Sequence, residues 1–451
     1  MSVLSRQRRG FMNTPSDLSR TSTAQMPVRR IRTFAFHISV WKQKVFCLYF
    51  PDRDFVFPRM YMGADEFASQ WAARIIAERD AEVFVWSKRA PPGLVDLARK
   101  HRIPLYFIED GFIRSVKANA SRTPPLSLTL DQGTAYFDSN APSDLENLLK
   151  THDFDGDPAL MERARAGIRF MLERGVSKYN SDVKSDMNAL YGRKMRKRVL
   201  VIGQVEDDAS IQYGCARPVT NNDLVVLAAT ENPGADILYK PHPDILNRVR
   251  LAQSDPQDVR HLCGILSAPL SMAQAFETID HVYTITSLAG FEALMRGIKV
   301  TAFGCPFYAG WGLTDDRQPN PRRGRTLSIE ELFAGTFLLY PHYFDPDTGS
   351  AATFETTVQS ISNHFARSAT NEDDDIQKRD GLRAGPLWRA YGPYGLLGWR
   401  HLLTPLISGI IGKVSGQYDV QIYREDPITF FREVPDAKLR LLGRILYPFS
   451  G

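Results

Sequence analysis

The chain has 451 residues, 43% hydrophobic and 11% aromatic, and this composition predicts a globular protein of two or three domains. Its four cysteines are scattered and form no CxxC pair, which argues against a zinc site or disulfide framework and fits a reducing cytoplasm. No run approaches the roughly 20 apolar residues of a spanning helix, and the first thirty residues lack a secretory signal. A net charge of +5 suits anionic substrates or an anionic membrane surface better than sequence-specific DNA. We therefore expect a cytoplasmic protein, soluble or peripheral at a membrane, with no nucleic-acid partner.

Residues 1–30 are rich in Ser, Thr, Arg and Met without apolar periodicity, which predicts a disordered arm. In residues 31–190 strand and helix patterns alternate and lead into a charged helical stretch. The expected strands are Val45–Phe50, Val83–Trp86 and Leu105–Ile108, and the expected helices are Trp71–Arg79, Leu94–His101 and about 157–197. Such alternation predicts a Rossmann-like domain with a parallel sheet and a helical insertion.

Residues 191–345 repeat this alternation and predict a second Rossmann-like domain. Its expected strands are Val199–Gly203, Ile237–Lys240, Val282–Thr286 and Val300–Phe303, and its expected helices are Asn222–Ala229, Ser271–Phe276 and Leu288–Arg296. We therefore predict an α/β protein in which two Rossmann-like domains face a central cleft.

The C-terminal part departs from this alternation. Ser328–Ala334 and Ala351–Arg367 read as terminal helices, and residues 346–380 combine the second of these with an acidic linker at 372–380. The tail, residues 381–451, mixes tryptophans and arginines with the apolar stretch Leu402–Ile411. It fits either an interfacial membrane segment or helices that pack back on the core.

A strand, a capped helix and a glycine stop follow one another in Thr284–Val300. Ser287 is a natural N-cap after the strand, so the helix N-terminus can hold a phosphate with backbone N–H groups. Glu292, within the first two turns, can accept hydrogen bonds from ribose hydroxyls. The alternative is an ordinary β-α-β unit with a solvated glutamate.

Two further polar loops follow apolar strands of the second domain. Gln204-Val-Glu-Asp-Asp-Ala-Ser210 would line the ligand crevice with three carboxylates, one of them poised as nucleophile or base and oriented by Gln204 or Ser210. A metal clamp on a nucleotide, or a solvated acidic turn, is the alternative. In Tyr239-Lys-Pro-His-Pro-Asp244 two prolines hold His242 rigid beside Lys240, where both could meet a phosphate or a sugar carboxylate.

A glycine- and aromatic-rich loop, Phe303–Arg317, follows the last of these strands. Gly310 and Gly312 permit unusual backbone angles around Trp311, so this ring could cover a base or sugar face. The alternative is a packed turn with a core tryptophan.

These motifs resemble, in order, those of the capsular-polysaccharide β-Kdo transferase family of the KpsC and LipA type. The resemblance covers about residues 80–345 and rests on Ile108–Ser115, Pro124–Leu128, Gln204–Ile211, Tyr239–Asp244, Thr286–Leu294 and Pro306–Thr314. It implies a GT-B fold and transfer of Kdo from CMP-β-Kdo with retention of configuration, without a metal or other cofactor. The first domain would bind the acceptor and the second the CMP-sugar.

The resemblance also implies roles for single residues. Asp208 would be the nucleophile; His242 would contact the CMP phosphate; and Ser287, Gly290 and Glu292 belong to the motif that binds phosphate and ribose. Glu109 or Asp110 would be the acid/base toward the acceptor hydroxyl. By charge and hydrogen-bonding capacity alone, Lys240, Ser210 and Arg114 are our candidates for holding the Kdo carboxylate.

Each motif occurs once, so we expect a single transferase module. Its acceptor would be a saccharide or glycolipid of capsule or lipopolysaccharide assembly, and its partners would be the inner membrane and the export machinery. The alternatives are a transferase of a related ulosonic acid, an inverting transferase of a UDP-sugar, and a non-catalytic assembly or export component that binds nucleotide-sugar.

Overall fold

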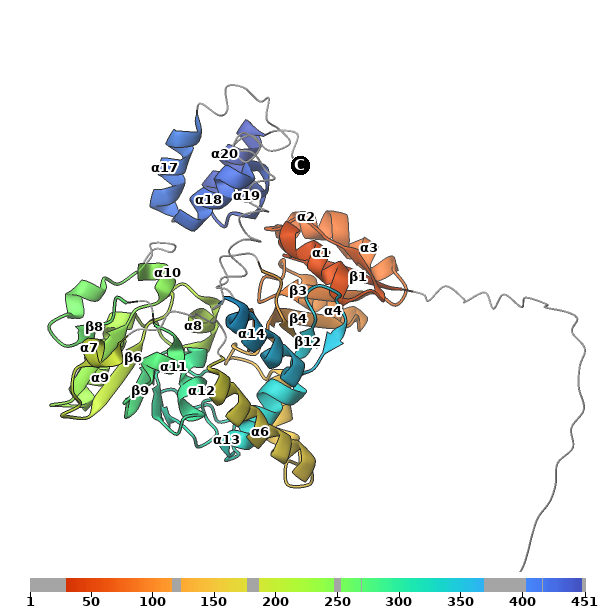
Figure 1. Ribbon diagram of the computed structural model, residues 1–451. Coiled ribbons are helices and arrows are strands. Elements are labelled where there is room, and N and C mark those ends of the chain that lie inside the picture. Colours follow the sequence, from red (N-terminus) through yellow and green to blue (C-terminus); the bar gives the residue numbers. More distant parts are fainter. Residues whose placement is uncertain are drawn as a thin grey trace, which may run out of the picture.

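The computed structural model describes residues 30–115, 123–176, 186–246, 253–268, 270–368, 403–415 and 417–447. In this part the chain forms two α/β domains and a C-terminal helical bundle, coloured mainly orange, green and blue in Figure 1. The expected arm, apart from Arg30, and the acidic run 372–380 lie outside the described residues.

The first domain is built on a mixed sheet with the strand order β13-β12-β5-β4-β3-β1-β2. Its strands are β1 (Ile31–Phe36), β2 (Arg53–Val56), β3 (Glu82–Trp86), β4 (Leu105–Asp110), β5 (Ser127–Asp131), β12 (His342–Phe344) and β13 (Ala351–Ala352). Its helices are α1 (Val40–Tyr49), α2 (Ala64–Phe67), a π-helical segment (Ala68–Ala72), α3 (Ala73–Ala77), α4 (Leu94–His101), α5 (Asp144–Thr151) and α6 (Pro158–Arg174). Strands β2, β1, β3 and β4 run parallel, whereas β5, β12 and β13 extend the sheet antiparallel.

The strand predicted at Val45–Phe50 is wrong, because most of this segment belongs to helix α1. Val45, Phe46 and Tyr49 are buried against the sheet at helical spacing. A short apolar run with a β-branched residue fits a strand and a buried helix equally well. Elsewhere in this domain the predicted positions at β3, α4 and β4 are confirmed.

The second domain has a sheet with the order β11-β10-β9-β6-β7-β8, and all its strand pairs are parallel. The strands are β6 (Arg198–Ile202), β7 (Asp236–Lys240), β8 (Gly264–Ile265), β9 (His281–Thr284), β10 (Lys299–Ala302) and β11 (Asp315–Asp316). The helices are α7 (Met187–Tyr191), α8 (Ala209–Gly214), α9 (Asn221–Glu231), α10 (Pro243–Leu246), a 3₁₀ turn (Pro256–Val259), α11 (Met272–Ala275) and α12 (Leu288–Leu294). Each element predicted for this domain is confirmed to within a few residues.

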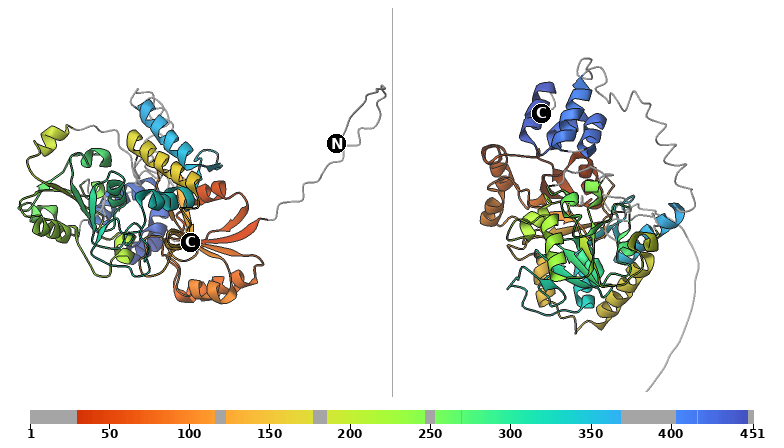
Figure 2. Two further views of the ribbon diagram at one scale, coloured as in Figure 1. Left: turned by 90° about the horizontal axis from the view of Figure 1, so that it is seen from below. Right: turned by 90° about the vertical axis from the view of Figure 1, so that its left-hand side faces the viewer.

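The chain returns to the first domain after completing the second. Helix α13 (Ile329–Phe333), a π-helical segment (Ala334–Leu339) and α14 (Phe354–Ser368) pack on α6, and β12 joins the first sheet beside β5. Figures 1 and 2 show α6 and α14 lying together between the two sheets. Residues 342–352 therefore belong structurally to the first sheet.

The C-terminal bundle consists of α17 (Thr404–Val414), α18 (Gln417–Glu425), α19 (Pro427–Glu433) and α20 (Ala437–Leu446), with a core of its own. It contacts the first domain through Glu433, whose backbone oxygen accepts a hydrogen bond from Tyr61 Oη at 2.8 Å. The tail thus packs back on the protein, as one of its two interpretations expected. Within the described ranges, no helix combines the length and apolarity needed to cross a bilayer.

Candidate active site

Three of the predicted motifs meet at one edge of the second sheet. Strand β6 lies between β9 and β7, and all three run parallel, so their carboxyl ends are neighbours. Asp208 follows β6, Lys240 ends β7 with His242 just beyond it, and Ser287 follows β9. Ligands of open α/β sheets bind at this edge.

Gln204 ties two of these strand ends together. Its Oε1 accepts the Thr286 backbone N–H at 2.8 Å, and its Nε2 donates to Thr286 Oγ1 at 3.1 Å. Thr286 Oγ1 in turn donates to Ser210 Oγ at 3.2 Å. Gln204 is 8% exposed, so in this structure it shapes the loops through Thr286, to which the sequence analysis had given no role of its own. Its predicted role in orienting a carboxylate would run through Ser210.

Asp208 is exposed and caps helix α8, with Oδ1 accepting the Ser210 backbone N–H at 2.8 Å. The cap fixes the carboxylate at the N-terminus of α8. Tyr213, on the same helix, packs on the first domain, with its ring 6.3 Å from that of Phe137. Asp208 therefore lies close to the boundary between the domains.

The expected cluster of three carboxylates is not formed. Glu206 is 7% exposed and turns toward the loop at 253–254: its oxygens accept the backbone N–H groups of Asn221, Gln253 and Ser254 at 2.7, 2.8 and 2.9 Å. The loop's need for hydrogen-bond acceptors thus removes this carboxylate from the site, while Asp207 and Asp208 stay exposed.

Lys240 and His242 present different kinds of positive group. Lys240 is 7% exposed, its pKa is lowered by burial, and none of the described carboxylates pairs with it. The Nδ1 atom of His242 accepts the Asp244 backbone N–H at 3.1 Å, so neutral His242 carries its proton on Nε2. Since a buried ammonium group without an anion is costly, this corner is suited to an anionic ligand.

Helix α12 is held from behind by Tyr308. Ser287 caps the helix by accepting the Ala289 N–H at 3.2 Å, and its backbone oxygen accepts a hydrogen bond from Tyr308 Oη at 2.5 Å. A Cβ on Gly290 would lie 2.2 Å from Tyr308 Oη, so this glycine makes room for Tyr308. Glu292 is 4% exposed. The nucleotide-binding roles of Ser287, Gly290 and Glu292 stay predictions.

The carboxyl end of β4 has two distinct carboxylates. Asp110 is buried between two cations, with Oδ1 3.3 Å from Lys42 Nζ and Oδ2 2.8 Å from Arg114 Nε. Arg114 has no exposed surface and also donates to Ser115 Oγ at 2.9 Å. Arg114 was expected to hold a sugar carboxylate, but its buried guanidinium pairs with Asp110 instead. Glu109, beside it, is half-buried.

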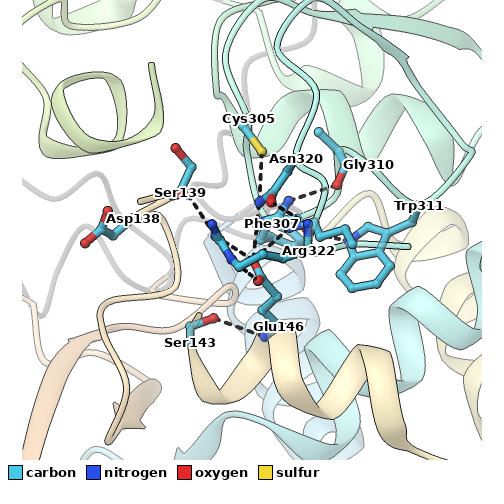
Figure 3. A network of polar contacts seen from close by, with 12 residues as sticks. Asp138, Ser139, Ser143, Glu146, Cys305, Phe307, Gly310, Trp311, Asn320 and Arg322 are labelled. Atoms are coloured by element: carbon cyan, nitrogen blue, oxygen red, sulfur yellow. Dashed lines mark hydrogen bonds and ion pairs between the residues drawn. The ribbon is translucent and has the colours of Figure 1, made fainter. Parts of the chain in front are cut away.

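Trp311 lies in the core, and its expected contact with a base or sugar is contradicted. The ring is completely buried and its Nε1 donates to the backbone oxygen of Phe307 at 2.9 Å. Figure 3 shows it beside the domain junction, where Glu146 of α5 meets Arg322 at 2.7 Å. The alternative, a packed turn, is the one adopted, because the loop braces the two domains.

Comparisons with known proteins agree with this architecture. A family model described as "Capsule polysaccharide biosynthesis protein" matches residues 82–343. The lipopolysaccharide-processing protein LpsZ of Rhizobium meliloti is 43% identical over 78% of this chain and 82% of its own length. The capsule polysaccharide modification protein LipA of Neisseria meningitidis serogroup B is 40% identical over 65% of this chain but only 41% of its own length.

Two solved structures of Thermosulfurimonas dismutans KpsC share the fold. The β-Kdo 2,4 transferase is 31% identical with a TM-score of 0.61 and covers 74% of this chain and 98% of its own. The β-Kdo 2,7 transferase is 30% identical with a TM-score of 0.57 and covers 74% and 99%. The expected GT-B-like fold of two Rossmann-like domains with terminal helices is confirmed. The chain belongs to the capsule polysaccharide biosynthesis family.

Proposed function

We propose that this protein is a retaining β-Kdo transferase, which moves Kdo from CMP-Kdo to a saccharide or glycolipid acceptor in capsule or lipopolysaccharide assembly. The KpsC transferases and LpsZ support the donor sugar and the pathway. One observation carries the assignment to this site: the exposed carboxylate of Asp208 lies in the loop after β6, and the buried ammonium of Lys240, with which none of the described carboxylates pairs, ends the adjacent parallel strand β7.

Two displacements at one carbon account for retention. In the first, the Asp208 carboxylate forms a bond to the anomeric carbon while the bond from that carbon to the CMP oxygen breaks, and CMP leaves with the electron pair. In the second, the acceptor hydroxyl attacks the same carbon, displaces Asp208 and gives up its proton to a base. The cap from Ser210 occupies Oδ1 of Asp208, and Oδ2 is the oxygen that would attack.

Positive groups would stabilise the departing phosphate without a metal or other cofactor. Lys240 supplies a charge in a poorly hydrated place, where electrostatic stabilisation is strong, and the Nε2 proton of His242 supplies a hydrogen bond. The N-terminus of α12, capped by Ser287, would add backbone N–H groups. Ser210 and Lys240 remain the candidates for the Kdo carboxylate.

Glu109 is the better candidate for the base. Both oxygens of Asp110 bind cations inside the first domain, so proton transfer there would disrupt a buried ion cluster. Glu109 is the last residue but one of β4 and is half-buried, so solvent and ligand can reach it.

Incubation with CMP-Kdo and a Kdo-terminated lipid tests the proposal. We expect transfer by the wild type, a loss of roughly 10³-fold or more in Asp208→Asn, and near-normal transfer by Asp207→Asn, a matched change one residue away. Mass spectrometry of a slow-turnover variant such as Glu109→Gln should find Kdo on the Asp208 peptide. Undiminished transfer by Asp208→Asn refutes the mechanism. CMP binding without turnover indicates a non-catalytic component, and stabilisation by UDP in place of CMP indicates a UDP-sugar transferase.

We further propose that the bundle docks on the inner membrane, next to the assembly and export machinery. Leu406, Ile410 and Val414 form an exposed apolar stripe along α17, with fractional exposures of 64%, 41% and 48%. Cosedimentation with anionic phospholipid vesicles tests this: Leu406→Ser with Ile410→Ser should weaken binding, whereas Val226→Ser, an exposed apolar residue of α9, should not. Equal binding by all three proteins refutes membrane docking through α17.

A further inference from the structure

A cavity of about 400 Å³ lies in the first domain, at the carboxyl ends of β1, β2 and β3. Its lining residues come from the segments that follow these strands and from the C-terminal bundle: Phe36, His37, Arg59, Tyr61, Met62, Arg89, Ala90, Pro91 and Pro435. It is at the same edge of the sheet as Glu109, the last residue but one of β4, which is the neighbour of β3. The position is therefore one where an open α/β domain binds a ligand.

The cavity carries positive charge that no described carboxylate neutralises. Arg89 is exposed and its Nη1 lies 3.1 Å from Nε2 of His37, while Arg440 of the bundle lies over the Tyr61 ring at 4.2 Å. Neither arginine forms an ion pair with a carboxylate of the described residues, whereas Arg59 pairs with Glu66. Two guanidinium groups near one cavity favour an oxyanion as ligand.

His37 fixes the direction of Arg89 without neutralising it. Burial, and then the charges of Arg89 and Arg440, lower the pKa of His37 to about 3, so the ring is neutral at pH 7. Its Nε2 atom accepts a hydrogen bond from Arg89 Nη1. The Tyr61 side chain also hydrogen-bonds with Arg89, so two contacts position a guanidinium group that carries five N–H donors.

The backbone around the cavity adopts an unfavourable conformation at three places. His37, Tyr61 and Ser87 have φ values of 60°, 56° and 56°, a region that non-glycine residues rarely occupy. His37 and Tyr61 line the cavity, and Ser87 stands two residues before Arg89. Such strained residues cluster at ligand sites.

The C-terminal bundle completes one wall. Tyr61 Oη donates to the backbone oxygen of Glu433, and the backbone N–H of Val40 donates to a carboxylate oxygen of Glu433 at 2.6 Å. Pro435 lines the cavity together with Phe36 and Tyr61 of the first domain. The result is an open pocket with apolar and cationic lining residues, and its volume is in the range of small-molecule sites.

On its other side, the loop after β3 contacts the donor-site helix. Lys88, next to Arg89, lies 5.7 Å from the ring of Tyr213 in α8, the helix that Asp208 caps. A ligand chain that ran from the cavity along β3 would therefore pass toward the proposed nucleophile.

We propose that this cavity binds an acidic sugar of the acceptor, with Arg89 contacting its carboxylate. The inference rests on the proposed function and names a subsite for it. The bundle, which lies outside the segment matched by the family model, would then take part in acceptor selection.

Binding and turnover, measured separately, test the subsite. Saturation-transfer NMR with free Kdo, in the presence of saturating CMP, should show that Kdo contacts the wild-type protein. Arg89→Ala should abolish this contact and Arg89→Lys should weaken it. The control is Arg99→Ala, which changes an exposed arginine of α4 and should leave the contact unchanged. In the transfer assay Arg89→Ala should raise the KM for a Kdo-terminated acceptor roughly 10- to 100-fold, as expected for a lost hydrogen bond to a charge. With an acceptor whose carboxylate is reduced to an alcohol, wild type and Arg89→Ala should not differ.

Each outcome bears on one of the two claims. Arg89-dependent Kdo binding without transferase activity refutes the proposed function and leaves the subsite standing. Transfer with an unchanged acceptor KM in Arg89→Ala and Arg89→Lys overturns the subsite alone. Inorganic phosphate that competes for Arg89 where free Kdo does not would assign the cavity to a phosphate of the acceptor lipid and overturn the acidic-sugar assignment.

Discussion

Glu146 joins the two domains, and its removal is the sharpest test of the junction in Figure 3. Its Oε1 lies 2.7 Å from Arg322 Nε and its Oε2 lies 3.0 Å from Arg323 Nε. The side chains of Glu146 and Arg323 are only 4% and 3% exposed, whereas that of Arg322 is 33% exposed. Glu146→Gln keeps the shape and removes the charge.

The expected loss follows from these exposures. Breaking a buried pair costs about 3–5 kcal/mol, because the remaining charge is left uncompensated. Arg323 still donates to the backbone oxygens of Pro306 and Ala309, so we take about 3 kcal/mol for it. The pair with the partly exposed Arg322 adds at most about 1 kcal/mol. Glu146→Gln should thus lose about 3–4 kcal/mol of unfolding free energy.

Urea denaturation, followed by circular dichroism and tryptophan fluorescence, measures this loss. The matched control is Glu355→Gln, which removes an equally short pair with Arg163 at 2.6 Å in which both side chains are more than 40% exposed. The control should cost less than about 1 kcal/mol. Equal losses in the two variants would show that burial does not decide the strength of the junction, and the reasoning would fail.

Three further predictions concern packing, pH and thiol reactivity. Gly290→Ala should lower the free energy of unfolding by about 1–3 kcal/mol in thermal denaturation, because the new Cβ meets Tyr308 Oη. Adding Tyr308→Phe should restore part of this loss. An alanine variant as stable as the wild type would contradict the prediction. Burial, followed by the charge of Lys197, lowers the pKa of His281 to about 4, so between pH 6.5 and 4 the unfolded chain binds a proton that the folded chain does not. The free energy of unfolding should therefore fall as the pH drops through this window. In urea titrations, His281→Gln should reduce the fall between pH 7 and pH 4 by about 3 kcal/mol. The same fall in the wild type and the variant would contradict the lowered pKa of His281. Cys47 is exposed. Burial raises the pKa of the other three thiols, that of Cys215 to about 12, that of Cys263 to about 11 and also that of Cys305. One thiol per chain, that of Cys47, should therefore react quickly with a thiol reagent at pH 8. A fast phase that survives Cys47→Ser would refute this.

The second domain was predictable because its strands are buried apolar runs, each followed by a chemically distinctive loop. The first domain was less so. Its helix α1 has the same composition as a strand, and only contact with the sheet beneath it decides between the two. The return of β12 to pair with β5 connects residues more than 200 positions apart, and no local pattern encodes such a pairing.

The motif order was enough to establish the family, the two-domain α/β architecture and the loops after β6, β7 and β9 as one edge of a sheet, because strand periodicity and turn chemistry are local properties. Which charged groups face a ligand was decided by packing. Glu206 and Arg114 stand in the same motifs as Asp208 and Glu109, yet the demand of buried donors and carboxylates for partners draws them inward. The cavity at Arg89 arose in the same way: segments following β1, β2 and β3 meet Pro435 from the far end of the chain, and only the folded protein brings them together.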